Sequence, residues 1–423
     1  MPTWVHFAER SVVGSPDRRA DTLHAVDPGA PSLWLDEASA TRLTPLGTGT
    51  HAVDAVVVGL GITGATAALE LAEAGLSVLG IDAHGLGWGA SARSGGFLLV
   101  EHAIEYPARR AQFGVDRMRT VIEMARSTHA LIESRFAKAG EHKRCGSLIL
   151  PMADDPKEQE TLAEAARLLT EDGVPCTTGV VRDDIQGFAP GLSIPEDGEV
   201  HPGKLLAEIG AQATAAGATL RQGLVTEIHP KQRLITTTDA TISYGVAVIA
   251  VNAWTRRLLP DIDIEPQRAQ MIATRPVAPV RTLDPVCYGC WGYDYFRQRD
   301  DGRLLLGGRR HLHREDEATD DTRTTDAIQG DLERYLERHL SAFGPFEIEA
   351  RWSGTMGFSP DELPFWRTLE DYDGAPSTHV LGGMTGHGMG LGAVCGQTVA
   401  RSTHCELDPV ERQRLDLLDA ERF

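Results

Sequence analysis

A glycine-rich turn between a buried strand and a helix is the feature that most limits how this chain can fold. Residues 53–58 read VDAVVV, a β-branched apolar run typical of a strand buried on both faces of a parallel sheet. Residues 59–64 read GLGITG and are followed by an alanine- and leucine-rich helical pattern that ends at Gly75. Residues 76–82 then predict a second strand. The segment therefore predicts one βαβ unit.

The G-x-G-x-x-G spacing of this turn suits a bound dinucleotide. Gly59 permits the tight turn from strand to helix, and the missing side chain of Gly61 lets a pyrophosphate approach the backbone. Gly64 lets the helix pack closely on the strand, so that the positive end of the helix dipole faces the phosphates. Asp82, at the end of the second strand, is placed to hold the ribose hydroxyls. The other contacts expected here are Ile62, Thr63 and Ala83.

The composition of the chain disfavours several other classes of protein. The 423 residues include 60 acidic and 41 basic ones, and the net charge of −19 repels both nucleic acid and anionic membranes. We find no apolar run of membrane-spanning length and no secretory signal, so we expect a cytoplasmic protein. The pair Cys287 and Cys290 has no second CxxC partner, so we predict no metal site. The oligomeric state stays open.

The run from Gly87 to Gly96 distinguishes between possible dinucleotides by resemblance. It reads GWGASARSGG and resembles the signature of the D-amino-acid oxidase superfamily, the glycine and sarcosine oxidase group. The γ-glutamylputrescine oxidase-like branch is the most similar. The resemblance extends in the same order to four other segments, which are SLWLDEA (32–38), DDGRLLLGG (300–308), RWSGTMGFSPDELPFW (351–366) and GGMTGHGMGLG (382–392).

The resemblance implies FAD as the cofactor and gives it a path along the chain. Ala90 and Ser91 would offer donors to the pyrophosphate, and the backbone of Val225 would meet the adenine. The helix that begins near Met389 would aim its positive end at the flavin, which stabilises the anionic reduced ring. Residues expected beside the flavin ring are Arg93, Gly95 and Gly96. Further expected contacts are Trp88, Gly89, Ser94, Ala250, Asn252, Trp254, Gly354, Gly383, His387, Gly388, Gly390 and Leu391.

Two departures from the family pattern bear on the cofactor and the substrate. Covalent members tether the flavin through cysteine or histidine, and residues 355–361, where the sarcosine-type cysteine would fall, contain no cysteine. We therefore expect non-covalent FAD. Members that oxidise amino acids hold the carboxylate with a basic residue near the flavin-facing helix, but residues 389–391 read MGL. We therefore expect amines without an α-carboxylate to be preferred.

Four residues are candidates for the catalytic end of the site. His387, between two glycines, would lie at the flavin edge, where we favour a role in shaping the cofactor site over direct proton transfer. Tyr295 and Arg297 alternate with Tyr293 on one predicted strand face, which lines the substrate cavity or is ordinary sheet surface. Glu101, followed by a histidine, either reaches the substrate amine or ends a solvated loop.

We predict an α/β chain, α+β overall, with a Rossmann-type FAD-binding domain and an inserted, mainly antiparallel substrate domain. The expected FAD-binding segments are 51–140, 198–258 and 345–423, the substrate-binding segments are 141–197 and 259–344, and residues 1–50 form an N-terminal arm.

The resemblance implies an amine or amino-acid oxidoreductase. A hydride would pass from the carbon bearing the nitrogen to flavin N5, the imine would hydrolyse, and O2 or another acceptor would reoxidise the flavin. The alternatives are an NAD(P)H-dependent flavin monooxygenase and a non-catalytic flavoprotein that acts as a binding module.

Overall fold

The computed structural model describes residue 27, residues 29–38 and residues 41–420. Residues 1–26, 28, 39 and 40 of the expected arm therefore lie outside the described residues. The α-helices are α1 (Leu33–Glu37), α2 (Ile62–Glu73), α3 (Tyr106–Phe113), α4 (Val115–Arg135), α5 (Pro156–Glu171), α6 (Pro202–Ala215), α7 (Thr255–Leu258), α8 (Arg314–Glu317), α9 (Asp326–His339), α10 (Gly388–Ser402) and α11 (Pro409–Leu418). None of these helices has both the length and the apolar character that crossing a membrane requires.

The strands of the described residues form two large sheets and one small one. The strands are β1 (Gly49–Val58), β2 (Val78–Asp82), β3 (Phe97–Leu98), β4 (Ser147–Leu150), β5 (Thr177–Val180), β6 (Gly191–Ile194), β7 (Gly198–Glu199), β8 (Thr219–Gln222), β9 (Val225–His229), β10 (Leu234–Thr237), β11 (Ala240–Ile249), β12 (Glu265–Thr274), β13 (Val286–Gly289), β14 (Asp294–Gln298), β15 (Leu304–Gly308), β16 (Ile348–Phe358), β17 (Phe365–Glu370) and β18 (Pro376–Gly382).

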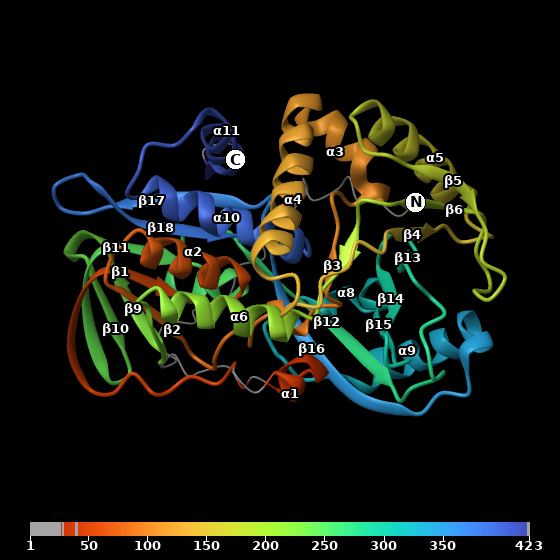
Figure 1. Ribbon diagram of the computed structural model, residues 1–423, viewed down its shortest axis with the longest axis horizontal. Coiled ribbons are helices and arrows are strands. Elements are labelled where there is room, and N and C mark those ends of the chain that lie inside the picture. Colours follow the sequence, from red (N-terminus) through yellow and green to blue (C-terminus); the bar gives the residue numbers. More distant parts are fainter. Residues whose placement is uncertain (1–26, 28, 39–40, 421–423) are drawn as a thin grey trace.

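The first large sheet contains the predicted βαβ unit. Its main strand order is β17-β18-β11-β1-β2-β8, and β1 pairs in parallel with β11 and β2. The predicted central strand is confirmed: Val56 and Val57 of β1 are fully buried, as expected for a strand covered on both faces. Helices α2, α6 and α10 pack beside one another against this sheet (Figure 1). The predicted parallel nucleotide-binding sheet is therefore confirmed.

The second large sheet is mainly antiparallel, as predicted. Its strand order is β16-β12-β15-β14-β13-β4-β6-β5, and helix α9 packs on β12 and β15 (Figure 1). A hairpin lies at its centre, with β14 and β15 joined through Gly302 at a positive φ of 84°. One expected boundary needs correction. The range 345–423 was placed with the FAD-binding segments, but β16 pairs along its length with β12.

The described part of the N-terminal arm reaches the loop after β2. Trp34 of α1 is fully buried, and its indole Nε1 donates to the carbonyl of Ser94 at 2.8 Å. The hydroxyl of Ser32 donates to the carbonyl of Ala92. The guanidinium of Arg297 lies over the Trp34 ring at 4.9 Å. This part of the arm is therefore pinned to the body of the protein, and it holds the loop of residues 92–94 in place.

Candidate active site

An elongated cavity of about 330 Å³ is lined by residues of both large sheets, a volume within the range of small-molecule sites. One end lies at the glycine-rich turn and at the carboxyl ends of β1, β2 and β11. This is the edge at which open α/β sheets bind their ligands. The other end is lined by residues of β13, β14 and β16 and by the start of α10.

Most residues predicted to hold the cofactor line this cavity. They are Gly59, Gly61, Ile62, Thr63, Asp82, Ala83, Trp88, Gly89, Ala90, Ser91, Arg93, Ser94, Gly95, Val225, Ala250, Asn252, Trp254, Gly354, His387, Gly388, Met389 and Gly390. Gly64, Gly96, Gly383 and Leu391 do not line it. Gly383 instead donates its N–H to the side chain of Asn252 at 3.0 Å, which fixes the chain next to the cavity.

The glycines of the turn are required by close approach. A Cβ at Gly64 would lie 1.9 Å from the carbonyl oxygen of Gly59, so only glycine lets α2 pack so tightly on β1. A Cβ at Gly61 would lie 2.9 Å from the hydroxyl of Ser91, which accepts the N–H of Ile62 at 3.0 Å. The backbone at the amino end of α2 therefore lines the cavity directly, with no side chain at Gly61 to cover it.

The carboxylate of Asp82 holds the backbone around this turn. It accepts the N–H of Leu60 at 2.8 Å and the N–H groups of His84 and Gly85 at 2.9 and 3.0 Å. Its place at the end of β2, on the cavity wall, fits the expected contact with a ribose.

The loop after β2 is held by two arginines. Arg93 donates to the carbonyls of Trp88 (2.9 Å), Ala30 (2.8 Å) and Ser353 (3.0 Å), and its burial lowers its pKa to about 10. Its guanidinium is therefore occupied in fixing the loop. Arg297 donates to the carbonyl of Gly96 at 3.1 Å.

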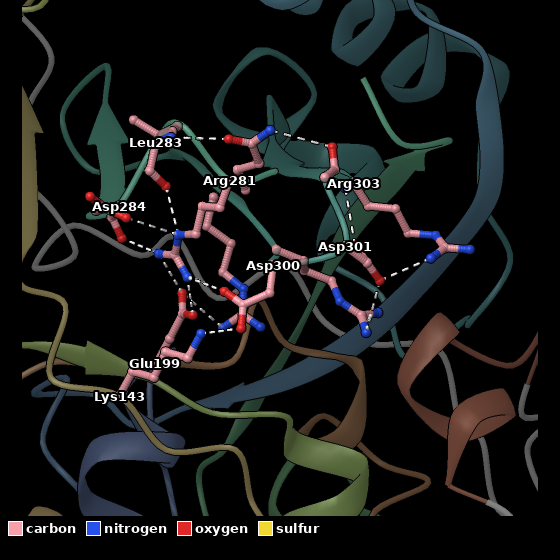
Figure 2. A network of polar contacts seen from close by, with 12 residues as sticks. Lys143, Glu199, Arg281, Leu283, Asp284, Asp300, Asp301 and Arg303 are labelled. Carbon is pink, nitrogen blue, oxygen red and sulfur yellow. Dashed lines mark hydrogen bonds and ion pairs between the residues drawn. The ribbon is translucent and has the colours of Figure 1, made fainter. Parts of the chain in front are cut away.

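Arg297 lies behind the loop instead of on the cavity wall. It also donates to the carbonyl of Val200 at 3.1 Å and lies 3.7 Å from the carboxylate of Glu199. Figure 2 shows Glu199 bound by Arg281 in a network that also joins Lys143 to Asp300. Tyr293 and Tyr295, which alternate with Arg297 along the chain, do line the cavity. The interpretation of Arg297 as a substrate-lining residue is wrong, because its donors face the carbonyls that support Gly96.

The far end of the cavity combines aromatic walls with charged and titratable groups. The side chains there are Phe97, Leu99, His102, Glu105, Tyr288, Trp291, Tyr293, Tyr295, Arg310, Met356, Phe358, Glu362 and His387. Sequence reasoning missed Glu105, Arg310 and Glu362. Burial and the nearby charge of Glu105 raise the pKa of Glu362 to about 7.

His387 presents a free ring nitrogen at this end. It precedes the first residue of α10, and its Nδ1 lies 2.8 Å from the carbonyl oxygen of Thr385, so Nδ1 carries the proton. Its Nε2 is buried and has no hydrogen-bond partner among the described residues. Burial, together with the neighbouring His102 and Arg109, lowers the pKa of His387 to about 3. The imidazole is therefore neutral, with a lone pair at Nε2.

Of the two glutamates that follow β3, Glu105 lines the cavity and the predicted Glu101 does not. Glu101 is buried beside the cavity, where it accepts from Arg109 at 2.7 Å and from the N–H of His102 at 2.8 Å. Glu105 lines the cavity, with a carboxylate oxygen 3.7 Å from Nδ1 of His102. Burial opposes the charge of Glu105, but the nearby His102, Arg109 and Arg310 hold its pKa below the ordinary value. The interpretation of Glu101 as a substrate contact is wrong, because Arg109 occupies it.

A cation lines the far end, contrary to the expectation from the start of α10. The guanidinium of Arg310 lies 4.9 Å from the ring centre of Tyr293 and 5.2 Å from that of Phe358. It makes no ion pair or hydrogen bond through its side chain with another described residue. Arg310 follows β15, so its role could not be found by inspecting the flavin-facing helix.

Comparisons with known proteins agree with this arrangement. The family model described as FAD dependent oxidoreductase matches residues 54–402. The probable oxidoreductase OrdL of Rhizobium meliloti is 28% identical, with 91% of this chain and 90% of the relative covered. The gamma-glutamylputrescine oxidoreductase of Escherichia coli is 25% identical, with 86% and 87% covered.

Solved structures share the fold. Glycine oxidase from Geobacillus kaustophilus superposes with a TM-score of 0.72 at 22% identity, over 84% of this chain and 96% of that one. L-proline dehydrogenase from P. horikoshii gives a TM-score of 0.70 at 21% identity, over 86% and 96%. The resemblance carried by the glycine-rich turn and the GWGASARSGG run is thereby confirmed, and the chain belongs to the FAD-dependent oxidoreductase family.

Proposed function

We propose that this protein oxidises a carbon–nitrogen bond of an amine, with FAD in the cavity as the electron acceptor. The observation that carries the proposal is the far end of the cavity, which is continuous with the dinucleotide-type turn. There, the free Nε2 of His387 and the carboxylate of Glu105 face the same space without hydrogen-bond donors from described residues. The Nε2 of His387 is buried, and a buried acceptor requires a donor, which the N–H group of an amine would supply.

The chain's residues fit FAD along the whole cavity. Val225 and Asp82 would hold the adenosine, and Gly61 with the amino end of α2 would hold the pyrophosphate. Gly95 and Met389 would lie beside the flavin ring. The amino end of α10 supplies a positive dipole where the ring gains charge.

The residues at the far end orient the substrate and exclude water. When bound, FAD would supply the acceptor for a hydride leaving the carbon that bears the nitrogen, and O2 or another acceptor would restore the oxidised cofactor. His387 accepts an N–H of the substrate at Nε2, which keeps the nitrogen at a fixed place. Phe97, Tyr288 and Tyr295 form aromatic walls that keep water away during the transfer. The imine then hydrolyses once water enters.

Anaerobic reduction separates this proposal from its alternatives. We expect a panel of primary and N-methyl amines to bleach the flavin absorbance of the FAD-loaded protein in the absence of oxygen. Bleaching by NADPH and not by any amine would indicate a monooxygenase. A flavin that neither reductant bleaches would indicate a binding module, and either result would contradict the proposal.

FAD is proposed to be held without a covalent bond. The described residues that line the cavity include no cysteine, so the sulfur that tethers flavin in some relatives is missing from the wall. We expect acid precipitation to release the flavin into the supernatant. Yellow colour that stays with the precipitated protein would point to attachment through a lining histidine.

A substitution at Gly61 directly tests where the pyrophosphate lies. In Gly61→Val the side chain would occupy the space beside Ser91, and such overpacking costs about 1–3 kcal/mol. We expect FAD binding to weaken by roughly 5- to 150-fold, measured as flavin retained per protein chain. Gly330→Val on α9 is the matched control, because a Cβ there meets only the mobile end of Arg334. Full retention in Gly61→Val would show that the cofactor lies elsewhere.

Arg310 changes the expected substrate preference. The sequence favoured amines without a carboxylate because no cation was found at the start of α10, and Arg310 removes that premise. Its guanidinium is held between the rings of Tyr293 and Phe358 with its hydrogen-bond donors unused by described residues. A planar guanidinium in this position suits a carboxylate. We therefore propose a substrate that carries both an amine and a carboxylate.

Matched substrates test this role of Arg310. In Arg310→Gln we expect KM for sarcosine or 4-methylaminobutanoate to rise roughly 10–100-fold, because a hydrogen bond to a charged group contributes about 1.5–3 kcal/mol. KM for an N-methylalkylamine of similar length should change little. Arg257→Gln is the control, because Arg257 also lines the cavity but is paired with Asp320 at 2.6 Å. An equal change for both substrate types would contradict the carboxylate contact.

A further inference from the structure

The three groups at the far end of the cavity also form a potential metal-binding cluster. Ligand atoms of His102, Glu105 and His387 lie within 4.8 Å of one another. We propose that these residues bind a divalent transition-metal cation, with Zn²⁺ the best match. Two histidines and one glutamate, with a fourth position open, are an established ligand set for zinc.

His387 is oriented as metal-bound histidines are. Such histidines usually donate the other ring N–H to a carbonyl or carboxylate, which fixes the tautomer. The Nδ1 of His387 makes this contact with the carbonyl of Thr385 at 2.8 Å. Its Nε2 is buried, and no described residue donates to it. The lone pair is therefore formed and held before any cation arrives.

The ring of His102 lies against Gly292, and the space it fills is open because glycine has no side chain. A Cβ at Gly292 would lie 2.3 Å from Cε1, 2.9 Å from Nε2 and 3.4 Å from Nδ1 of His102, so the Cε1 edge of the ring faces Gly292. The other ring nitrogen, Nδ1, is buried without a hydrogen bond and lies 3.7 Å from a carboxylate oxygen of Glu105. The second nitrogen thus adjoins the carboxylate that would share the cation.

The charges around the cluster leave room for a cation. Arg109 is neutralised by Glu101 at 2.7 Å. Arg310 is a second cation at this end, and Glu362 on the same wall, whose pKa is raised to about 7, carries only part of a negative charge at neutral pH. Glu105 receives no hydrogen bond from a described residue, so its charge is compensated only by neighbours at a distance. A bound divalent ion would satisfy this carboxylate directly.

A second cluster in the described chain provides a contrast. Cys290, Asp294 and His311 also bring ligand atoms within 4.8 Å. The carboxylate of Asp294 already accepts two hydrogen bonds from Arg309, one from its backbone N–H and one from its guanidinium, each at 2.8 Å. Burial also raises the pKa of Cys290 to about 12, so its thiol is protonated. This cluster therefore has its cation already, and a substitution there serves as a matched control.

A consequence for catalysis rests on the proposed function. The Nε2 of His387 and the carboxylate of Glu105 are the groups that would receive the amine. Zn²⁺ on the same atoms would exclude the amine, and inhibition would be competitive with it. Binding of the cation itself does not depend on which substrate is oxidised.

The test uses the FAD-loaded protein without a histidine tag, freed of metal by a chelator and then titrated with ZnCl₂ in a calorimeter. We expect one Zn²⁺ per chain in the wild type and no comparable binding of MgCl₂, which prefers oxygen ligands. Glu105→Gln and His102→Ala should each weaken binding by at least about 10-fold, since loss of even an outer-shell partner costs 10–100-fold. Cys290→Ser should bind as the wild type does. Flavin content and melting temperature show whether each variant is folded.

Each contrary result overturns the assignment. Absence of stoichiometric Zn²⁺ binding in the wild type would do so, as would unchanged affinity in both Glu105→Gln and His102→Ala. Weakened binding in Cys290→Ser alone would place the cation in the other cluster. An enzyme that no amine reduces, but that binds Zn²⁺ through these residues, would contradict the proposed function and leave the metal site standing.

Discussion

The close approach of α2 to β1 is the constraint on which the rest of the structure depends. A side chain at Gly64 would meet the carbonyl of Gly59 at 1.9 Å, so the helix can lie this near the strand only through glycine. That approach places the amino end of α2 on the cavity wall, where the backbone of Gly61 is open to a phosphate. The loop after β2, which lies beside Gly61, is in turn held by Arg93 and by Trp34 from the N-terminal arm.

Local patterns predicted the cofactor end well, because its residues follow one another in the chain. Residues of the turn, the end of the second strand and much of the loop up to Gly95 lie on the cavity wall. The substrate end is assembled from distant segments. Glu105, Arg310 and His387 come from three regions of the chain, and no periodicity links them. Their meeting depends on how the two sheets pack, which the sequence pattern of one segment does not contain.

The errors at the substrate end have specific physical causes. Alternation along β14 correctly placed Tyr295 and Arg297 on one face, but the face passes from the open cavity to the space beneath Gly96. The acidic residue was misassigned because Glu101 turns inward to Arg109, and the next carboxylate along the chain, at Glu105, faces the cavity instead. The alternation of side chains along a strand thus determines which side of the sheet a residue faces. The segment that packs over that side determines what the residue contacts.

We propose that a single cavity holds the flavin next to the amine-binding acceptors His387 and Glu105. A crystal structure of the FAD-loaded protein tests it most directly. The account predicts density for the flavin ring between Gly95 and Met389, with its reactive N5 edge open to the space bounded by Glu105 and His387. Density that places the ring away from these residues, or that turns N5 away from them, would contradict the account.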